Sequence, residues 1–367
     1  MVLPHVATNA RLVVLSSPDE FAAVENEWNG LALADGTPFL THQWLFHWWR
    51  AFGDGESFCI LLRQPGGALD AGAVLRRRSS RVVSATTNAY GEQWDVIAAD
   101  SESRRSIWEE IGRLRASKLA LGGLRADGPS IEPATTALAA SGWRLATAVE
   151  QRSPYVALPD SGEELLAGVS RNHRSDIKRR RKRLHAEGNV RLNTLTLPGL
   201  SRDLDRFFEL EASGWKGRGG SAVLQDPAAH ALYTSFAKAA AAAGWLRLRF
   251  LELDGVAVAA DLSCALGGAE FLLKTCFDER LSRLSPGAVL RAEVLQAAIE
   301  EGSRRYEFLG GPDAYKVRWG GNIHEVLGVT AYRGTGLPEY LYRIKLRRTA
   351  ARLLARRRSP EADGESE

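Results

Sequence analysis

A phenol and an ammonium group stand side by side at Tyr315 and Lys316, shortly after a helix whose start could bind an anion. Ser285 and Pro286 are typical of a helix start, because serine can cap free backbone amides and proline has no amide to leave unpaired. The unpaired amides and the partial positive charge of such a helix end suit a phosphate group. Most helices that begin in this way bind nothing, but the nearby phenol and ammonium favour a transferase site.

The elements that position these residues form a strand, a helix, a second strand and a helical turn. Residues 271–277 and 306–309 are apolar enough to be strands, and Gly302 ends the helix between them. Apolar residues recur on one face of that helix at Val289, Leu290, Val294, Leu295 and Ala298. Residues 313–319 then predict a helical turn near the same sheet edge. Upstream, the Asp254-Gly255 pair predicts a tight hairpin.

Short motifs continue this pattern over about 150 residues. They are Ser170–Arg174 with its basic helix, Gly214-Trp215-Lys216, Leu253–Ala259, Ser285-Pro286-Gly287, Gly302, Gly310 and Tyr315-Lys316. The stretch from about residue 170 to 319 resembles the acetyltransferase domain of the cellulose-biosynthesis (CelD-like) branch of the GNAT superfamily, which is related to the FemABX aminoacyl transferases. Residues 23–73 are similar to the degenerate first half of such proteins. One departure is the helix start, Leu284–Ala288, which lacks the Arg/Gln-x-x-Gly-x-Gly/Ala loop of acetyl-CoA-binding members and leaves the acyl donor open.

The resemblance implies an α/β fold of two tandem GNAT-like domains, each with a mixed sheet flanked by helices, the first domain being degenerate. It implies a first domain at 1–155, an acyltransferase domain at 156–340, and a basic helix with a disordered tail at 341–367. In this family two parallel strands splay apart to admit the pantetheine arm of acyl-CoA, and the diphosphate lies on a helix start. Ser285, Gly287 and Ala288 are the corresponding residues here.

Acyl transfer to an amine needs a base for the amine and benefits from an acid for the leaving thiolate. The resemblance places Tyr315 near the sulfur, so Tyr315 is the predicted acid. Asp261 lies in an otherwise apolar strand and is the predicted base, since burial would raise the pKa of its carboxyl group. Glu307 is a rival for that role. Lys274 could instead neutralise Asp261 across the hairpin.

Other residues are candidates for binding. Arg171 and Arg174 lie one helical turn apart and could clamp an anionic group of the donor or acceptor. Trp215 and Lys216 precede a glycine-rich stretch that could form a lid or an aromatic platform for a sugar. Lys274 and Lys316 are further candidate substrate contacts, although solvated lysines would look the same.

Composition bounds the other possibilities. The chain has 367 residues, 45% of them hydrophobic, which is enough for two cores. Its three cysteines are too scattered for a disulfide framework, and no Cys/His spacing indicates a metal site. The start lacks a secretory signal, and no stretch approaches the apolar length of a membrane span. A cytoplasmic protein is therefore expected.

The net charge of +4 is concentrated in two segments. Residues 171–183 contain eight basic residues and one acidic residue, and residues 341–358 contain eight basic residues and no acidic one. The first segment lacks the interleaved aromatic residues typical of base stacking, so nucleic acid is not an expected partner. The second predicts an amphipathic helix that either packs on the domain or lies on the anionic inner face of a membrane.

These features predict an N-acyltransferase that uses acyl-CoA as co-substrate and no metal. The resemblance implies a small amine acceptor, such as an amino sugar of cell-envelope or exopolysaccharide synthesis. One alternative is a FemABX-like transferase that uses aminoacyl-tRNA. Another is a non-catalytic binding module of a polysaccharide-synthesis complex.

Overall fold

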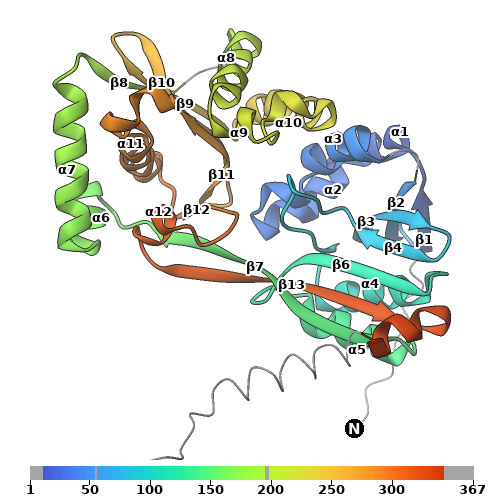
Figure 1. Cartoon of the computed structure of the whole chain (residues 1–367). Coiled ribbons are helices and arrows are strands. Elements are labelled where there is room, and N and C mark those ends of the chain that lie inside the picture. Colours follow the sequence, from blue (N-terminus) through green and yellow to red (C-terminus); the bar gives the residue numbers. More distant parts are fainter. Residues whose placement is uncertain (1–10, 54–55, 195–197, 343–367) are drawn as a thin grey trace, which may run out of the picture.

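The structure, a computed structural model, describes residues 11–53, 56–194 and 198–342 and, of Trp215, the backbone only. The chain forms one continuous mixed sheet with helices on its faces (Figure 1). The predicted basic helix at 341–358 lies outside the described residues from residue 343 onward.

The first half runs from a short edge strand through three helices to an antiparallel set of strands, a helix, a parallel strand and a long last strand. Its elements are β1 (Arg11–Leu15), α1 (Pro18–Ala22), α2 (Glu25–Ala32), α3 (His42–Phe52), β2 (Ser57–Arg63), β3 (Leu69–Ser79), β4 (Val82–Ala85), β5 (Ile97–Ala98), α4 (Ser101–Arg113), β6 (Lys118–Arg125), α5 (Ile131–Ala140) and β7 (Arg144–Ala157).

The second half repeats this order after two connecting helices, α6 (Gly162–Gly168) and α7 (Arg171–His185). Its elements are β8 (Val190–Thr194), α8 (Leu200–Ser213), α9 (Trp215–Arg218), α10 (Pro227–Ala242), β9 (Leu246–Leu253), β10 (Val256–Leu266), β11 (Ala269–Phe277), the 3₁₀ helix η4 (Glu279–Leu284), α11 (Pro286–Glu300), β12 (Arg305–Glu307), α12 (Ala314–Val317) and β13 (Asn322–Tyr332).

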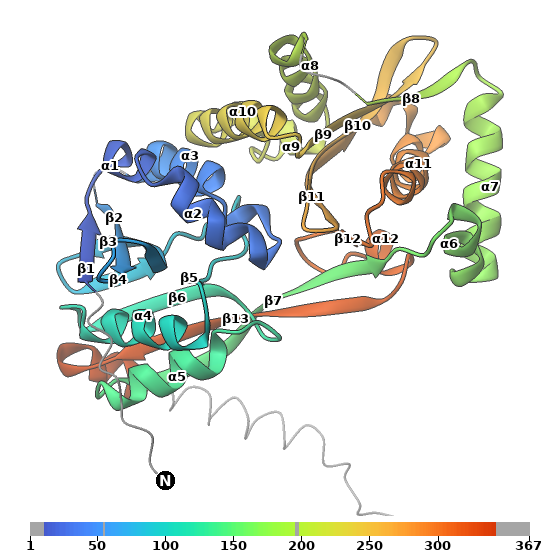
Figure 2. The ribbon, with the colours of Figure 1, turned by 180° about the vertical axis from the view of Figure 1, so that it is seen from behind.

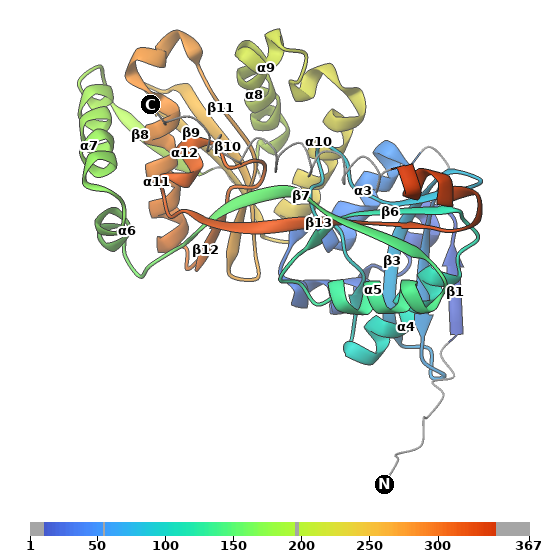
Figure 3. The same ribbon diagram turned by 60° about the horizontal axis from the view of Figure 1, so that its bottom comes forward.

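The two halves exchange their last strands. The strand order is β1-β2-β3-β4-β6-β13-β7-β12-β11-β10-β9-β8, so β13 of the second half pairs with β6 of the first, and β7 pairs with β12. Strands β7 and β13 run antiparallel to each other along their length and join the halves, as Figures 2 and 3 show. Because β7 and β13 each pair with a strand of the other half, the strands of the two similar halves form one sheet. The boundary predicted at residue 155 falls inside β7, which contacts both units.

A shared apolar core also joins the halves. Trp44 on α3 packs edge to face against Phe236 on α10, with ring centroids 4.9 Å apart. Trp44, Trp48 and Trp49 are at most 3% exposed and belong to this core. Separate clusters fill the space under α4 and α5 in the first half and under α11 in the second.

The parallel strand pair of the second half separates as predicted. Residues Ala269–Phe271 of β11 pair with Arg305–Glu307 of β12, and β11 then continues to Phe277 with no described strand along that edge. Helix α11 begins near the open end, and its predicted apolar face is fully buried at Val289, Leu290, Val294, Leu295 and Ala298. The parallel strands β11 and β12 therefore leave a gap between them, and helix α11 starts beside this gap.

Candidate active site

A cavity of about 800 Å³ occupies the gap between β11 and β12. Residues 272–277 of β11 form one wall and residues 308–310 after β12 form another. Helices α11 and α7 lie on one side of β11, and α8 and α10 on the other (Figure 1). Lining residues come from both sides, so a ligand on the α11 side can meet a second ligand that enters from the α8 side.

The start of α11 lines the cavity at Ser285, Gly287 and Ala288. Ser285 does not cap the helix with its side chain, contrary to the sequence prediction, because its backbone is left-handed at φ 55°. Its carbonyl oxygen instead accepts the amides of Ala288 and Val289, at 3.0 and 3.3 Å. Among the described residues the amide of Gly287 has no hydrogen-bond partner, which leaves it for a ligand.

Tyr315 on α12 lines the same cavity, and its side chain is 46% exposed. Its hydroxyl group makes no hydrogen bond to the described residues, so it does not fasten the helix to the sheet. Partial burial raises the pKa of Tyr315 to about 12, against the opposing effect of Arg291. The phenol therefore stays protonated at neutral pH, as a proton donor must.

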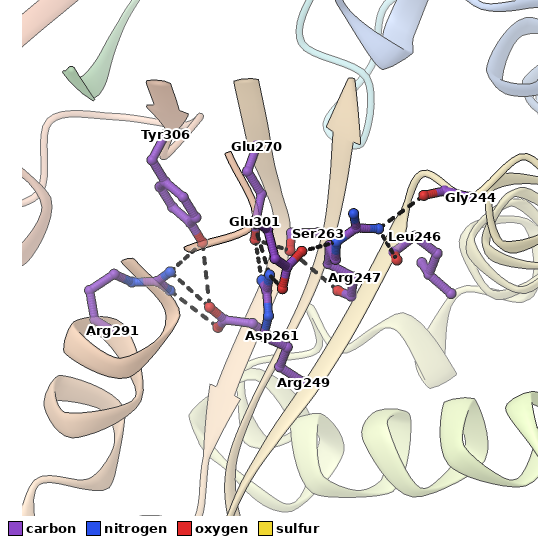
Figure 4. A network of polar contacts seen from close by, with 10 residues as sticks. All are labelled: Gly244, Leu246, Arg247, Arg249, Asp261, Ser263, Glu270, Arg291, Glu301 and Tyr306. Atoms are coloured by element: carbon purple, nitrogen blue, oxygen red, sulfur yellow. Dashed lines mark hydrogen bonds and ion pairs between the residues drawn. The ribbon is translucent and has the colours of Figure 1, made fainter. Parts of the chain in front are cut away.

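Asp261, the predicted base, lies beneath the cavity and does not line it. Its carboxylate is 0% exposed and pairs with Arg291 of α11, with oxygen–nitrogen distances of 2.7 and 3.1 Å (Figure 4). Arg291 also donates a hydrogen bond to the hydroxyl group of Tyr306. Burial lowers the pKa of Arg291, but Asp261, Tyr306 and Tyr315 together outweigh burial, so the pKa is raised. This pair anchors α11 to the sheet, and Lys274 takes no part in it.

A second buried ion pair continues this layer along the sheet (Figure 4). Arg249 of β9 pairs with Glu270 of β11 at 2.5 Å and with Glu301 after α11 at 2.7 Å. Ser263 donates to the Glu270 carboxylate at 2.6 Å. Because each buried charge has a partner, the layer fixes the end of α11 as Arg291 fixes its beginning.

Glu307, the rival base, faces away from the cavity. It is 1% exposed, pairs with Arg305 at 2.6 Å, and lies 3.2 Å from the imidazole Nε2 of His324 on β13. Side chains alternate between the two faces of a strand, so Tyr306 points toward α11 and Glu307 points away from it. The geometry thus does not bring either predicted base to the cavity.

Helix α7 presents a different face from the predicted one. Arg171 and Arg174 do not line the cavity, whereas His173, Asp176, Ile177 and Arg180 do. The Asp176 carboxylate is held by Arg180 at 2.7 Å. The prediction that Arg171 and Arg174 hold an anion therefore named the wrong face of α7, because these residues are next to the face that lines the cavity and not on it.

The candidate lysines all line the cavity, but two of them are already engaged. Lys316 donates to the carbonyl oxygens of Leu309 and Gly311 at 2.9 and 3.1 Å and pairs with Asp313 at 3.0 Å. All three N–H groups of its ammonium are used, so this lysine holds the loop after β12 rather than a substrate.

Lys216 pairs with the buried Glu211 and donates to the carbonyl oxygen of Thr275, each at 2.9 Å. Lys274 differs, because it makes no ion pair with the described residues and lies 5.1 and 5.2 Å from the rings of Tyr90 and Tyr233. Burial lowers its pKa, opposed by Glu211. The side chain of Trp215 lies outside the described residues.

Glu92 of the first half also lines the cavity, which the sequence did not indicate. It belongs to the long connection between β4 and α4, and no periodicity or motif marks it. The corresponding connection in the second half, between β11 and α11, also lies at the cavity. The repeated order of elements in the two halves is the sequence signal that could have indicated the connection between β4 and α4 as part of the site.

The comparisons with known proteins agree with this geometry. Residues 171–317 match the family described as an acetyltransferase (GNAT) domain. With the splayed strands and the repeated order of elements, this match indicates a GNAT-type acyltransferase domain in the second half of a fold built from two tandem halves. The match does not distinguish branches of the superfamily, so the CelD-like assignment stays a prediction.

Solved structures share the fold over most of the chain. The C-terminal domain of a putative lysylphosphatidylglycerol synthetase from Agrobacterium fabrum has 12% sequence identity and a TM-score of 0.55, over 89% of this chain and 95% of that chain. FemX has 13% identity and a TM-score of 0.54, over 81% and 92%. L-PGS from Bacillus licheniformis has 13% identity and a TM-score of 0.51, over 87% and 92%. At such identities the likeness is one of fold alone.

No curated protein matches the chain in sequence. Within the described ranges, no group of three or more His, Cys, Asp or Glu side chains could hold a metal ion. No helix in the same ranges has the length and apolar character needed to span a bilayer.

Proposed function

We propose that the protein transfers an acyl group from an acyl-CoA thioester to an amine. The separation of β11 from β12 carries this proposal, because a cavity open to both faces of the sheet can hold a donor and an acceptor. The start of α11 supports a site for the donor's diphosphate, because the amide of Gly287 has no hydrogen-bond partner in the described part of the chain. The resemblance supports an amino sugar or a related envelope or exopolysaccharide precursor as acceptor.

In this reaction the acceptor amine acts at the carbon of the thioester, and Tyr315 acts at its sulfur. The unprotonated amine attacks the thioester carbon, a carbon–nitrogen bond forms, and the carbon–sulfur bond breaks. The thiolate leaves with the electron pair and takes a proton from Tyr315, whose pKa of about 12 keeps it protonated until then. The nitrogen loses the proton that the amide does not keep, and this proton restores the Tyr315 phenol.

A second candidate is a transferase whose donor is aminoacyl-tRNA. The exposed basic residues of α7, next to the face that lines the cavity, favour it. Its donor ester would enter the same gap, and its leaving group would be a ribose oxygen. The likeness of fold to FemX fits this candidate, although the fold itself is shared by both.

Thermal unfolding with added ligands separates these candidates. A ligand that binds only the folded state stabilises it by about 2.7 kcal/mol at 100 times its Kd. We expect coenzyme A and acetyl-CoA to raise the Tm and deacylated tRNA to leave it unchanged at moderate salt. A rise with tRNA alone would support the second candidate. No shift with either, together with no thioester turnover, would support the non-catalytic module.

Gly287→Glu should abolish the rise in Tm that coenzyme A produces, because a carboxylate would then face the diphosphate. A side chain at this position would begin 3.2 Å from the ring of Phe277, so some steric cost is expected for any residue. Gly287→Gln is the matched control, because it has the same size without the charge. Equal coenzyme A binding by the wild type and Gly287→Glu would disprove this placement of the donor.

A further inference from the structure

The first half closes its own strand gap with the chain between β4 and α4. Strand β4 pairs in parallel with β6 only from Val82 to Ser84. Beyond that point Trp94 fills the gap: its amide donates to the carbonyl oxygen of Gly123 at 3.0 Å, and its indole nitrogen donates to that of Val74 at 2.8 Å. Trp94 is 2% exposed, so this loop is a fixed part of the core.

The same loop extends Glu92 into the cavity of the second half. One carboxylate oxygen, Oε2, accepts the amide of Gly310 at 2.7 Å and the side-chain amide of Gln151 at 2.6 Å. Leu309 and Gly310 are both left-handed, at φ 54° and 62°, which turns the Gly310 amide toward Glu92. The other oxygen, Oε1, makes no hydrogen bond to the described residues. Glu92 is thus held in place by one oxygen and offers the other.

The other carboxylates that line the cavity are engaged or solvated. Both oxygens of Asp176 are taken by arginines of α7. Those of Glu211 are taken by Lys216 and by the amide of Val223. Glu279 pairs with Arg218, and Asp313 pairs with Lys316 and is 61% exposed. Glu92 is therefore the best-placed carboxylate in the cavity.

We propose that Glu92 is the base that accepts the proton of the acceptor amine, so that the degenerate first half completes the active site of the second. This inference rests on the proposed acyl transfer. The protonated amine gives one proton to Oε1 of Glu92, and its freed electron pair attacks the thioester carbon. Tyr315 protonates the departing thiolate at the other end. The second ammonium proton, which the amide does not keep, leaves the nitrogen as the carbon–sulfur bond breaks and restores the Tyr315 phenol through solvent. An acceptor that depends on this step carries a basic amine, charged at neutral pH.

Glu92→Gln tests the role with two amine probes, since the glutamine oxygen can still accept the bonds from Gly310 and Gln151. The probes are glucosamine, which is largely protonated at neutral pH, and hydroxylamine, which is largely unprotonated and needs no base before it attacks. Acetyl-CoA is the donor, and release of free thiol is measured with the whole chain. We expect transfer to glucosamine to fall by roughly 10²-fold or more and transfer to hydroxylamine to change by less than about threefold.

The ratio of the two rates decides the outcome. Asp313→Asn, a matched change from carboxylate to amide in the same cavity, should leave that ratio unchanged whatever it does to either rate. A wild-type ratio in Glu92→Gln would overturn the base role while leaving the acyl transfer intact. A selective loss of glucosamine transfer in Lys274→Met but not in Glu92→Gln would assign the base to Lys274 instead. No thiol release from the wild type with either amine would refute the acyl transfer itself.

Discussion

Tyr315→Phe should lower kcat by roughly 10²–10⁴-fold with little change in KM, because proton donation to the thiolate occurs only in the transition state. The hydroxyl group has no hydrogen-bond partner among the described residues, so its removal should cost almost no stability. Steady-state release of thiol from acetyl-CoA, with hydroxylamine as acceptor, measures the effect. Because hydroxylamine is largely unprotonated at neutral pH, the measured rate does not depend on removal of a proton by Glu92 before the attack.

The pH dependence and a control complete this test. With a pKa of about 12, Tyr315 stays protonated through the neutral and mildly alkaline range, so the wild-type kcat should not fall up to about pH 10. Tyr340→Phe is the matched control and should keep the wild-type kcat, because the Tyr340 ring lies tilted against Tyr332, where β13 pairs with β6, and does not line the cavity. An unchanged kcat in Tyr315→Phe would rule out the acid role.

Asp261→Ala should reduce the free energy of unfolding by about 3–5 kcal/mol, because it leaves the buried Arg291 without its carboxylate. Arg291 is 3% exposed and Asp261 is fully buried, so the charge that remains on Arg291 is poorly solvated. Urea unfolding followed by tryptophan fluorescence measures the change. The double variant Asp261→Leu with Arg291→Met should regain much of the loss, since it removes both charges together.

This result also separates two roles for Asp261. If Asp261 were the base, as its position in an apolar strand suggested, the conservative variant Asp261→Asn would lose transfer to glucosamine and keep transfer to hydroxylamine. The ion pair predicts instead that both rates change in proportion to the fraction folded. A selective loss at full stability would contradict the structural role.

Local patterns predicted the elements of the site well. The Asp254-Gly255 turn is left-handed at both residues, at φ 50° and 80°, as the tight hairpin requires. The apolar stripe of α11 and the short parallel strand pair follow from side-chain spacing, which depends only on neighbours along the chain. The GNAT-type fold, with a degenerate first half, followed from motifs that occur in a fixed order.

Contacts between distant segments could not be predicted in this way. Asp261 and Arg291 lie 30 positions apart on different elements, and nothing in either segment indicates the other as its partner. Ser285 looked like a cap because of its type, but its left-handed backbone turns the side chain from the free amides. Glu92 reaches the cavity only because β7 and β13 join the halves, and its loop has no motif.

The structure of the protein with coenzyme A bound tests the central claim most directly. We expect the pantetheine arm to lie between residues 272–277 of β11 and residues 308–310 after β12, with a diphosphate oxygen on the amide of Gly287 and the sulfur within hydrogen-bond reach of the Tyr315 hydroxyl group. Coenzyme A bound elsewhere, with the gap between β11 and β12 empty, would contradict the account.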